Sequence, residues 1–307
     1  MMSNPAPAAP RRRLPAWLKV KLPSGERYRW IREQARTFNL HTVCEEARCP
    51  NIGECWDGGT ATFMLMGDTC TRGCRFCSVK TLRNPGALDP AEPLHVAETI
   101  RGMALDYVVL TSVNRDDLPG QGSGHIAETV RRTQLANPEL LIEILIPDFM
   151  GDMDCVRTVL EARPAVLAHN VETVERLQSK VRDPRANYGQ SLAVLSYAKA
   201  QAPEIRTKSS LMLGLGESEA EVIETMGDLR AIGVDFLTLG QYLQPDKKKL
   251  SVEAFVHPER FQVLERVGME MGFRYVAAGP LVRSSYRAAE FFIAQSLREE
   301  RPAPAVS

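Results

Sequence analysis

Residues 62–77 read TFMLMGDTCTRGCRFC, a short apolar run that passes directly into a cysteine-rich segment. The run 62–66 is almost continuously apolar, as expected of a strand buried on both faces. Cys70, Cys74 and Cys77 follow it with the spacing C-x3-C-x2-C. Three possible ligands directly after a buried strand predict a site at the carboxyl end of a parallel sheet.

The same alternation continues along the chain. Further apolar runs lie at 107–111, 141–146, 165–169, 205–212, 236–239 and 275–278, with helical patterns at 124–135, 152–162, 189–200, 218–231 and 258–271. Ser218 and Glu221 form a capping box at the start of one helix, and Gly233 ends it. Alternating strands and helices predict parallel strands with right-handed crossovers. We therefore expect an α/β fold, a partial (β/α)6 TIM-type barrel with N- and C-terminal extensions covering its open end.

A dinucleotide-binding fold is the competing architecture for such alternation. Its fingerprint, G-x-G-x-x-G, follows the first strand closely. The best glycine cluster, Gly120, Gly122 and Gly124, has His125 at the final position and lies well past the strand. The sequence therefore argues against a nucleotide site of this kind.

The composition is that of a globular chain. Its 307 residues carry 38 basic and 38 acidic side chains, and 44% are hydrophobic. These values exclude a mainly disordered chain. No apolar stretch approaches the ~20 residues of a membrane span, and no basic stripe with interleaved aromatics suggests nucleic acid.

The ends differ in composition from the middle. Residues 1–25 hold five basic and no acidic side chains and are rich in proline, which predicts a disordered N-terminus rather than an amphipathic transit peptide. We expect an N-terminal extension at 26–60, the barrel at 61–273, a C-terminal segment at 274–293 and a disordered tail at 294–307. No export signal is evident, so we expect a cytoplasmic protein.

Six of the seven cysteines lie between Cys44 and Cys77, and a reducing compartment favours metal binding over disulfides for such a cluster. Three closely spaced thiolates can hold three irons of a cubane and leave the fourth iron open to a substrate. A structural zinc site completed by a distant histidine is the alternative. Cys155 stands apart and is expected to be a packed thiol.

C-x3-C-x2-C after the first strand of such a chain resembles the radical S-adenosylmethionine superfamily. A second trio, Cys44, Cys49 and Cys55, has the spacing C-x4-C-x5-C, and near the end stands RSSY at 283–286. With the segments 111–117, 170–173, 208–214 and 279–286, these motifs resemble the lipoyl synthase family from about residue 30 to 290.

The resemblance implies two [4Fe–4S] clusters and S-adenosylmethionine. Cys70, Cys74 and Cys77 would hold the radical-generating cluster, and Cys44, Cys49, Cys55 and Ser285 an auxiliary one. Two deoxyadenosyl radicals would act at C6 and C8 of an octanoyl chain on a lysine of a carrier domain, and the auxiliary cluster would donate two sulfurs. The implied partners are a carrier of the 2-oxoacid dehydrogenase E2 or glycine-cleavage H protein type, a low-potential electron donor and an iron–sulfur carrier.

Polar residues at strand ends are candidates for holding S-adenosylmethionine. Glu172 can accept from ribose hydroxyls and Lys208 can face a carboxylate. The other candidates are Asn170, Arg185 and Ser210, with Asn114, Arg115, Asp116 and Asp117, which follow the second strand, ranked slightly below them. Each can equally cap a helix or form a structural pair. Arg283 can contact substrate or hold the C-terminal segment, and His125, His169 and His257 are expected to be structural.

Two other functions compete with lipoyl synthesis. Another sulfur-inserting radical enzyme, such as a biotin synthase or a methylthiotransferase, does not combine the first trio with RSSY. A two-cluster electron carrier would need no barrel and would be expected to hold eight cysteines where six are clustered here.

Overall fold

The computed structural model describes residues 14–19, 25–38, 40–46, 49, 51–57, 62–103, 105–285, 293, 295 and 297. Most of the two predicted disordered ends, and Tyr286, lie outside the described residues. Among those described, no helix combines the length and apolarity needed to cross a membrane.

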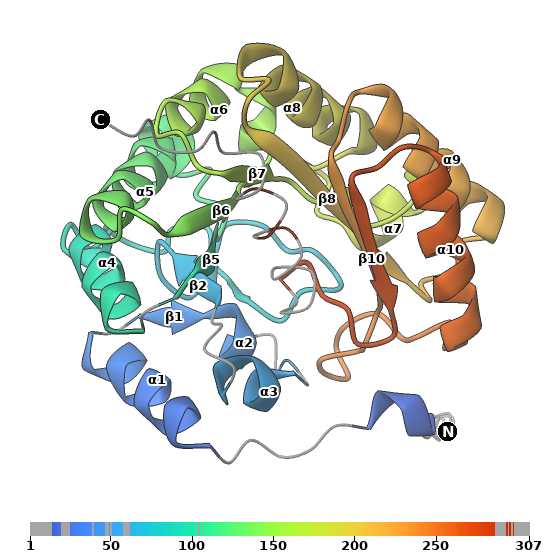
Figure 1. The fold of residues 1–307 in the computed structure, drawn as a ribbon, viewed down its shortest axis with the longest axis horizontal. Coiled ribbons are helices and arrows are strands. Elements are labelled where there is room, and N and C mark those ends of the chain that lie inside the picture. Colours follow the sequence, from blue (N-terminus) through green and yellow to red (C-terminus); the bar gives the residue numbers. More distant parts are fainter. Residues whose placement is uncertain are drawn as a thin grey trace, which may run out of the picture.

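A single curved sheet of eight strands forms the frame of the molecule (Figure 1). Its order is β1-β2-β5-β6-β7-β8-β9-β10, and every neighbouring pair from β2 onward is parallel. The seven apolar runs of the sequence are its parallel strands, as predicted: β2 (Thr62–Leu65), β5 (Tyr107–Ser112), β6 (Leu141–Leu145), β7 (Val166–Ala168), β8 (Arg206–Leu213), β9 (Phe236–Gln241) and β10 (Tyr275–Gly279). Their residues are almost all buried, which explains the absence of polar alternation in these runs.

Six helices follow the first six parallel strands and form an outer ring around the sheet: α4 (Glu92–Met103), α5 (Ser123–Ala136), α6 (Met153–Leu160), α8 (Tyr188–Gln201), α9 (Glu219–Ala231) and α10 (Pro258–Glu270). The six βα units confirm the predicted partial barrel. The capping box of Ser218 and Glu221 is formed at the start of α9. The helix α4 was not among the predicted helices.

The C-terminal boundary of the barrel lies later than expected. β10 pairs with β9 from Tyr275 to Gly279, so the sheet extends past residue 273. Ile293 is fully buried against the first residues of several strands, including Tyr107 and Leu141, and Leu297 packs against the same cluster. These apolar side chains cover the amino-terminal end of the barrel, so Leu297 does not belong to a disordered tail.

The N-terminal extension lies at the open side of the sheet, between the edge strands β1 (His41–Thr42) and β10 (Figure 1). β1 pairs antiparallel with β2. Three short helices belong to this extension: α1 (Glu26–Thr37), α2 (Val43–Glu46) and α3 (Ile52–Asp57). Trp17, on the 3-10 helix η1 (Ala16–Leu18), packs edge-on against His257 at the start of α10, with ring centroids 5.1 Å apart.

Candidate functional site

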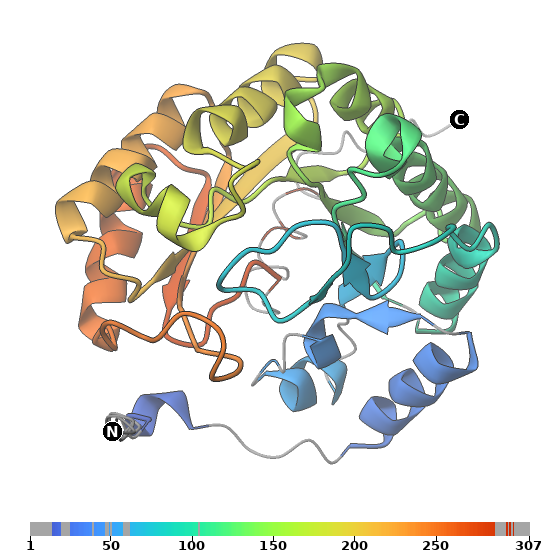
Figure 2. The ribbon, with the colours of Figure 1, turned by 180° about the vertical axis from the view of Figure 1, so that it is seen from behind.

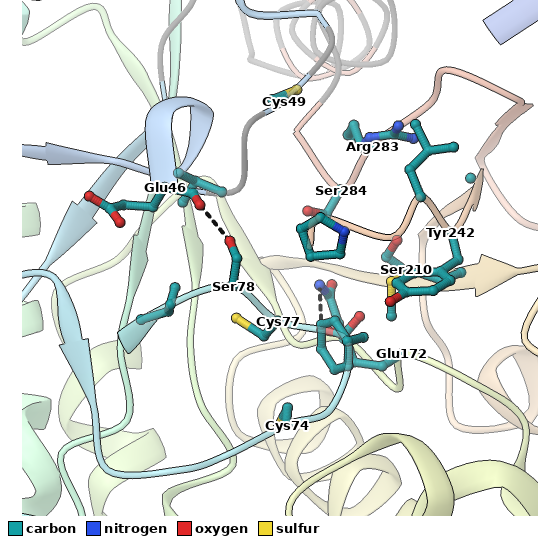
Figure 3. A pocket seen from close by; sticks show the side chains of 18 of the residues that line it. Glu46, Cys49, Cys74, Cys77, Ser78, Glu172, Ser210, Tyr242, Arg283 and Ser284 are labelled. Atoms are coloured by element: carbon teal, nitrogen blue, oxygen red, sulfur yellow. Dashed lines mark hydrogen bonds between the residues drawn. The ribbon is translucent and has the colours of Figure 1, made fainter. Parts of the chain in front are cut away.

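The C-x3-C-x2-C cysteines lie on the loop that follows β2, which crosses the mouth of the barrel (cyan in Figure 2). Met66 and Gly67, at φ +68° and +86°, turn the chain out of β2. Cys70 ends the short strand β3 (Thr69–Cys70), and Cys74 and Cys77 precede β4 (Lys80–Thr81). All three line a cavity of about 1510 Å³. Figure 3 shows Cys74 and Cys77 in this cavity.

These three thiols are free and half-buried. Burial raises the pKa of Cys74 to about 12 and that of Cys77 to about 11. The backbone N–H groups of Arg72 and Asn114 donate to Cys70 Sγ over 3.4 and 3.3 Å. A bound metal removes the proton from such a thiol, and N–H groups aimed at sulfur stabilise the ligated thiolate. The arrangement therefore fits a thiolate-bound iron cluster.

A buried arginine inside the motif fixes this loop to the barrel. Arg72 is 4% exposed and donates from Nε to Asp116 over 2.9 Å and from Nη1 to Asp148 over 2.8 Å. Asp116 follows β5 and Asp148 follows β6, so one guanidinium joins two strand ends to the loop. Burial raises the pKa of Asp148, Arg72 lowers it, and the net result is a lowered pKa.

Asp183 holds the loop from its other side. Its Oδ2 accepts from the Gly73 N–H over 2.8 Å, and its own N–H donates to Cys74 Sγ over 3.4 Å. Arg185 donates to Asp183, to Asp116 and to the carbonyl oxygen of Thr71. Asp116, Asp183 and Arg185 lie outside the cavity lining, so these charged groups support the loop from behind the site.

The first trio lines the same cavity from the N-terminal extension. Cys44 lies on α2, Cys55 on α3 and Cys49 between them, and Cys44 and Cys55 are buried. The N–H of Cys49 donates to the Cys44 carbonyl oxygen over 3.0 Å, which folds the trio back on itself. Six thiols from two separate segments therefore share one space.

The C-terminal segment contacts the part of the N-terminal extension that carries the first trio. Asn51, between Cys49 and Cys55, donates from Nδ2 to the Leu281 carbonyl oxygen over 2.6 Å. Thr62 donates from Oγ1 to Ser285 Oγ over 2.8 Å. Ser284 and Ser285 both line the cavity. Contacts that join positions about 230 residues apart bring Ser285 to the cysteine side of the site.

Arg283 is also built into this junction. It donates from Nη1 to the Val282 carbonyl oxygen over 2.7 Å and interacts with the Cys49 thiol. Burial lowers the pKa of the guanidinium, while Cys49 raises it. Of its two predicted roles, these contacts support holding the C-terminal segment.

Four of the six candidate S-adenosylmethionine ligands line the cavity: Asn114, Asn170, Glu172 and Ser210. Glu172 has φ +67°, an uncommon value for a residue with a side chain, and its backbone bonds to β8 on both sides. Burial raises the pKa of its carboxyl group, and Asn170 donates to Oε1 over 3.2 Å. The strained backbone aims this carboxyl group into the cavity (Figure 3).

Two candidates lie elsewhere. Lys208 is 1% exposed and donates to both carboxylate oxygens of Glu143 over 2.8 Å, near the start of β8 and away from the cavity lining. Its side chain points into the barrel interior and is neutralised there. Arg185 is committed to Asp183 and Asp116. Assigning a residue to a strand in the sequence does not show how far from the carboxyl end of the barrel its side chain lies.

Sequence reasoning missed a buried polar chain beside the cavity. Arg182 donates to Ser191 Oγ over 2.7 Å, and Ser191 Oγ lies 2.9 Å from His169 Nε2. His169 Nδ1 lies 2.9 Å from the Ile146 carbonyl oxygen and must donate to it. His125 pairs with Glu92 and His257 packs on Trp17, consistent with structural roles for all three histidines. Cys155 is buried on α6.

Comparison with known proteins identifies two family models in the chain. Residues 64–229 match the radical SAM superfamily, and residues 4–49 match the N-terminal domain of lipoyl synthase. A lipoyl synthase of Anaeromyxobacter sp. (strain Fw109-5) is 58% identical over 95% of this chain and 99% of its own length. The mitochondrial lipoyl synthase of Homo sapiens is 58% identical over 92% of this chain and 77% of its own length.

Solved structures support the fold. The chain resembles SuiB of Streptococcus suis bound to precursor peptide SuiA, with TM-score 0.54 and 10% identity over 82% of this chain and 52% of that one. It also resembles HydG, a maturase of the [FeFe]-hydrogenase, with TM-score 0.53 and 13% identity over 81% and 65% of the two chains. At such low identity these likenesses concern architecture alone.

Proposed function

This chain belongs to the lipoyl synthase family of the radical S-adenosylmethionine superfamily, and from that premise we propose that its two cysteine trios hold two [4Fe–4S] clusters in one cavity. The observation that carries the proposal is that all six clustered cysteines and Ser285 line a single space at the carboxyl end of the barrel. Relatedness over nearly the whole chain favours this function over an electron carrier or another sulfur-inserting enzyme.

When bound, S-adenosylmethionine and the cluster at Cys70, Cys74 and Cys77 supply deoxyadenosyl radicals that remove hydrogen from C6 and C8 of an octanoyl chain, and the cluster at Cys44, Cys49, Cys55 and Ser285 supplies two sulfur atoms. The chain itself must shield such a reaction from water. Apolar side chains of the lining can do so while contacting an aliphatic substrate, among them Val109, Leu145, Leu211, Met212, Val252 and Phe255.

The polar lining residues have a separate task. Asn170, Glu172, Ser210 and Asn114 offer the hydroxyl, carboxyl and amide groups that the amino acid and ribose parts of S-adenosylmethionine require. Glu172 is the strongest of these, since its strained backbone is held by two hydrogen bonds to β8. The substrate carrier, a low-potential electron donor and an iron–sulfur carrier complete the proposed set of partners.

Two triple variants test the assignment of the trios after anaerobic reconstitution. Replacing Cys70, Cys74 and Cys77 with alanine should abolish 5′-deoxyadenosine formation, while the auxiliary iron remains. Replacing Cys44, Cys49 and Cys55 should preserve deoxyadenosine formation but abolish lipoyl-lysine formation from an octanoyl-lysine peptide, measured by mass spectrometry. Each variant should lose about half of the iron.

The assignment is wrong if either triple variant still yields lipoyl-lysine at the wild-type rate. Cys155→Ala is the matched control, because this buried thiol lies outside the cavity lining. It should change neither the iron content nor either product.

A further inference from the structure

Three consecutive lysines stand at the mouth of the cavity, on the connection between β9 and α10. Lys247 and Lys248 are exposed and Lys249 is half-buried. Lys247 belongs to the cavity lining, so the segment borders the opening through which a substrate must pass. The proposed chemistry gives these lysines no role.

The backbone of this lysine turn, residues 246–249, is held firmly. Asp246 Oδ1 accepts from the Lys248 N–H over 2.7 Å, and Gln244 donates from Nε2 to the Lys249 carbonyl oxygen over 2.8 Å. The following N–H, that of Leu250, donates over 3.1 Å to the carbonyl oxygen of Arg75. Arg75 lies between Cys74 and Cys77 on the loop that follows β2, called the cluster loop below. The turn is therefore a fixed platform attached to the loop that carries Cys70, Cys74 and Cys77.

The charges of this platform are not neutralised within the described part of the chain, where no acidic group forms an ion pair with Lys247, Lys248 or Lys249. The acidic side chains nearby are engaged, since Asp246 caps the turn and Glu253 pairs with Lys180 over 3.2 Å. Arg75 is exposed beside the turn and donates to the Lys180 carbonyl oxygen. A cationic patch thus borders the cavity of a chain whose formal net charge is zero.

We propose that the lysine turn, together with Arg75, is the docking surface for the protein that carries the substrate, and that this carrier presents an acidic face around its modified lysine. The inference rests on the proposed function, in which the acyl chain arrives on a protein. A short lysyl arm reaches the cavity only when the carrier sits at its mouth. Complementary charge there increases encounter rates and fixes orientation.

The test compares an intact carrier domain with a short octanoyl-lysine peptide. Lys247→Glu/Lys248→Glu reverses two charges, and Lys249 is left unchanged because its charge influences Cys77 on the cluster loop. We expect KM for the octanoylated domain to rise about tenfold more than KM for the peptide. The excess should shrink at high salt, because screening weakens the attraction in the wild-type enzyme.

Two further double variants serve as controls, one for the position of the reversed charges and one for the charge itself. Arg101→Glu/Arg131→Glu reverses two exposed charges on the outer helices α4 and α5 and should alter neither KM. Lys247→Arg/Lys248→Arg preserves charge and should keep the domain KM near the wild-type value.

The docking proposal is overturned if domain and peptide respond equally, if neither responds, or if the excess is independent of salt. These outcomes differ from a failure of the proposed function itself. In that case the wild-type enzyme would form no lipoyl product from either substrate.

Discussion

Ser285 illustrates how much a single contact specifies at the scale of one residue. A serine near the end of a chain ordinarily satisfies local backbone groups. Here its Oγ accepts from Thr62, a β2 residue that is 4% exposed, and faces the cavity that holds the first trio. A buried hydroxyl that donates to a proposed ligand oxygen fixes that oxygen's position and its electron density.

Removing the Thr62 hydroxyl should weaken the binding of the proposed auxiliary cluster by Ser285, because its Oγ is then no longer held in place. In Thr62→Val the shape is kept but the hydroxyl is lost, at a cost of about 1 kcal/mol, or roughly fivefold in an equilibrium constant. We expect faster loss of auxiliary iron to citrate, followed by Mössbauer spectroscopy, and slower lipoyl formation at an unchanged rate of deoxyadenosine formation.

Thr62→Ser retains the hydroxyl and serves as the matched control, with near wild-type iron retention. Ser285→Ala sets the upper limit of the effect. If Ser285→Ala leaves both cluster content and lipoyl formation unchanged, the serine is not a ligand and the role given to Thr62 falls with it.

At the scale of elements, the position of the C-terminal segment depends on the end of β9. Gly240 pairs with Gly279 of β10 and lies directly against the backbone of Val282. A Cβ at residue 240 would stand 2.2 Å from the Val282 carbonyl oxygen. The absence of a side chain at this strand end therefore lets residues 280–285 cross over the barrel toward the first trio.

Gly240→Ala should displace this crossing segment. The overlap involves backbone rather than a flexible side chain, so the segment itself must move, at about 1–3 kcal/mol. We expect faster tryptic cleavage after Arg283, read by mass spectrometry, and reduced lipoyl formation.

Gly124→Ala on α5 is the corresponding control, because a Cβ there meets nothing within 4 Å. Equal cleavage rates in the two alanine variants would contradict the proposed dependence on Gly240.

At the scale of the whole molecule, the stability of the fold depends on pH through the buried hydrogen-bonded series of Arg182, Ser191 and His169. Burial, and then the Arg182 charge, lower the pKa of His169 to about 4 from its usual 6.5. Below pH 6.5 the unfolded chain binds a proton at this histidine that the folded chain rejects. The free energy of unfolding is therefore not reduced by His169 above pH 6.5, and it declines as the pH falls from 6.5 toward 4.

This decline should amount to roughly 1.4 kcal/mol per pH unit across the window. Denaturant unfolding of the anaerobic holoenzyme between pH 7.5 and 5 measures it. His169→Asn should be less stable at pH 7.5 but flatter in its pH dependence, whereas His257→Asn, at an exposed site, should keep the wild-type slope. A slope unchanged in His169→Asn would refute the assignment.

Local patterns were sufficient for the parallel strands and for five of the six outer helices, and the cysteine spacing was sufficient to nominate candidate cluster ligands. Buried parallel strands appear as continuous apolar runs, and the capping box at Ser218 is contained within four residues. The helix α4 was not predicted because its first residue, Glu92, is polar but buried. Its carboxylate pairs with His125 of α5, and no local pattern in the sequence shows this partner. Lys208 was misplaced for a similar reason, since Glu143 is 65 residues away.

The sequence by itself determined the parallel strands and carried the motifs of the family to which this chain belongs, because strand periodicity and cysteine spacing are properties of neighbouring residues. Only the tertiary structure decided which residues from distant parts of the sequence lie side by side. It placed Ser285 against Thr62, Arg72 between Asp116 and Asp148, and the lysine turn beside the cluster loop. Such pairings depend on the closure of the barrel, which brings strand ends together irrespective of their separation along the chain.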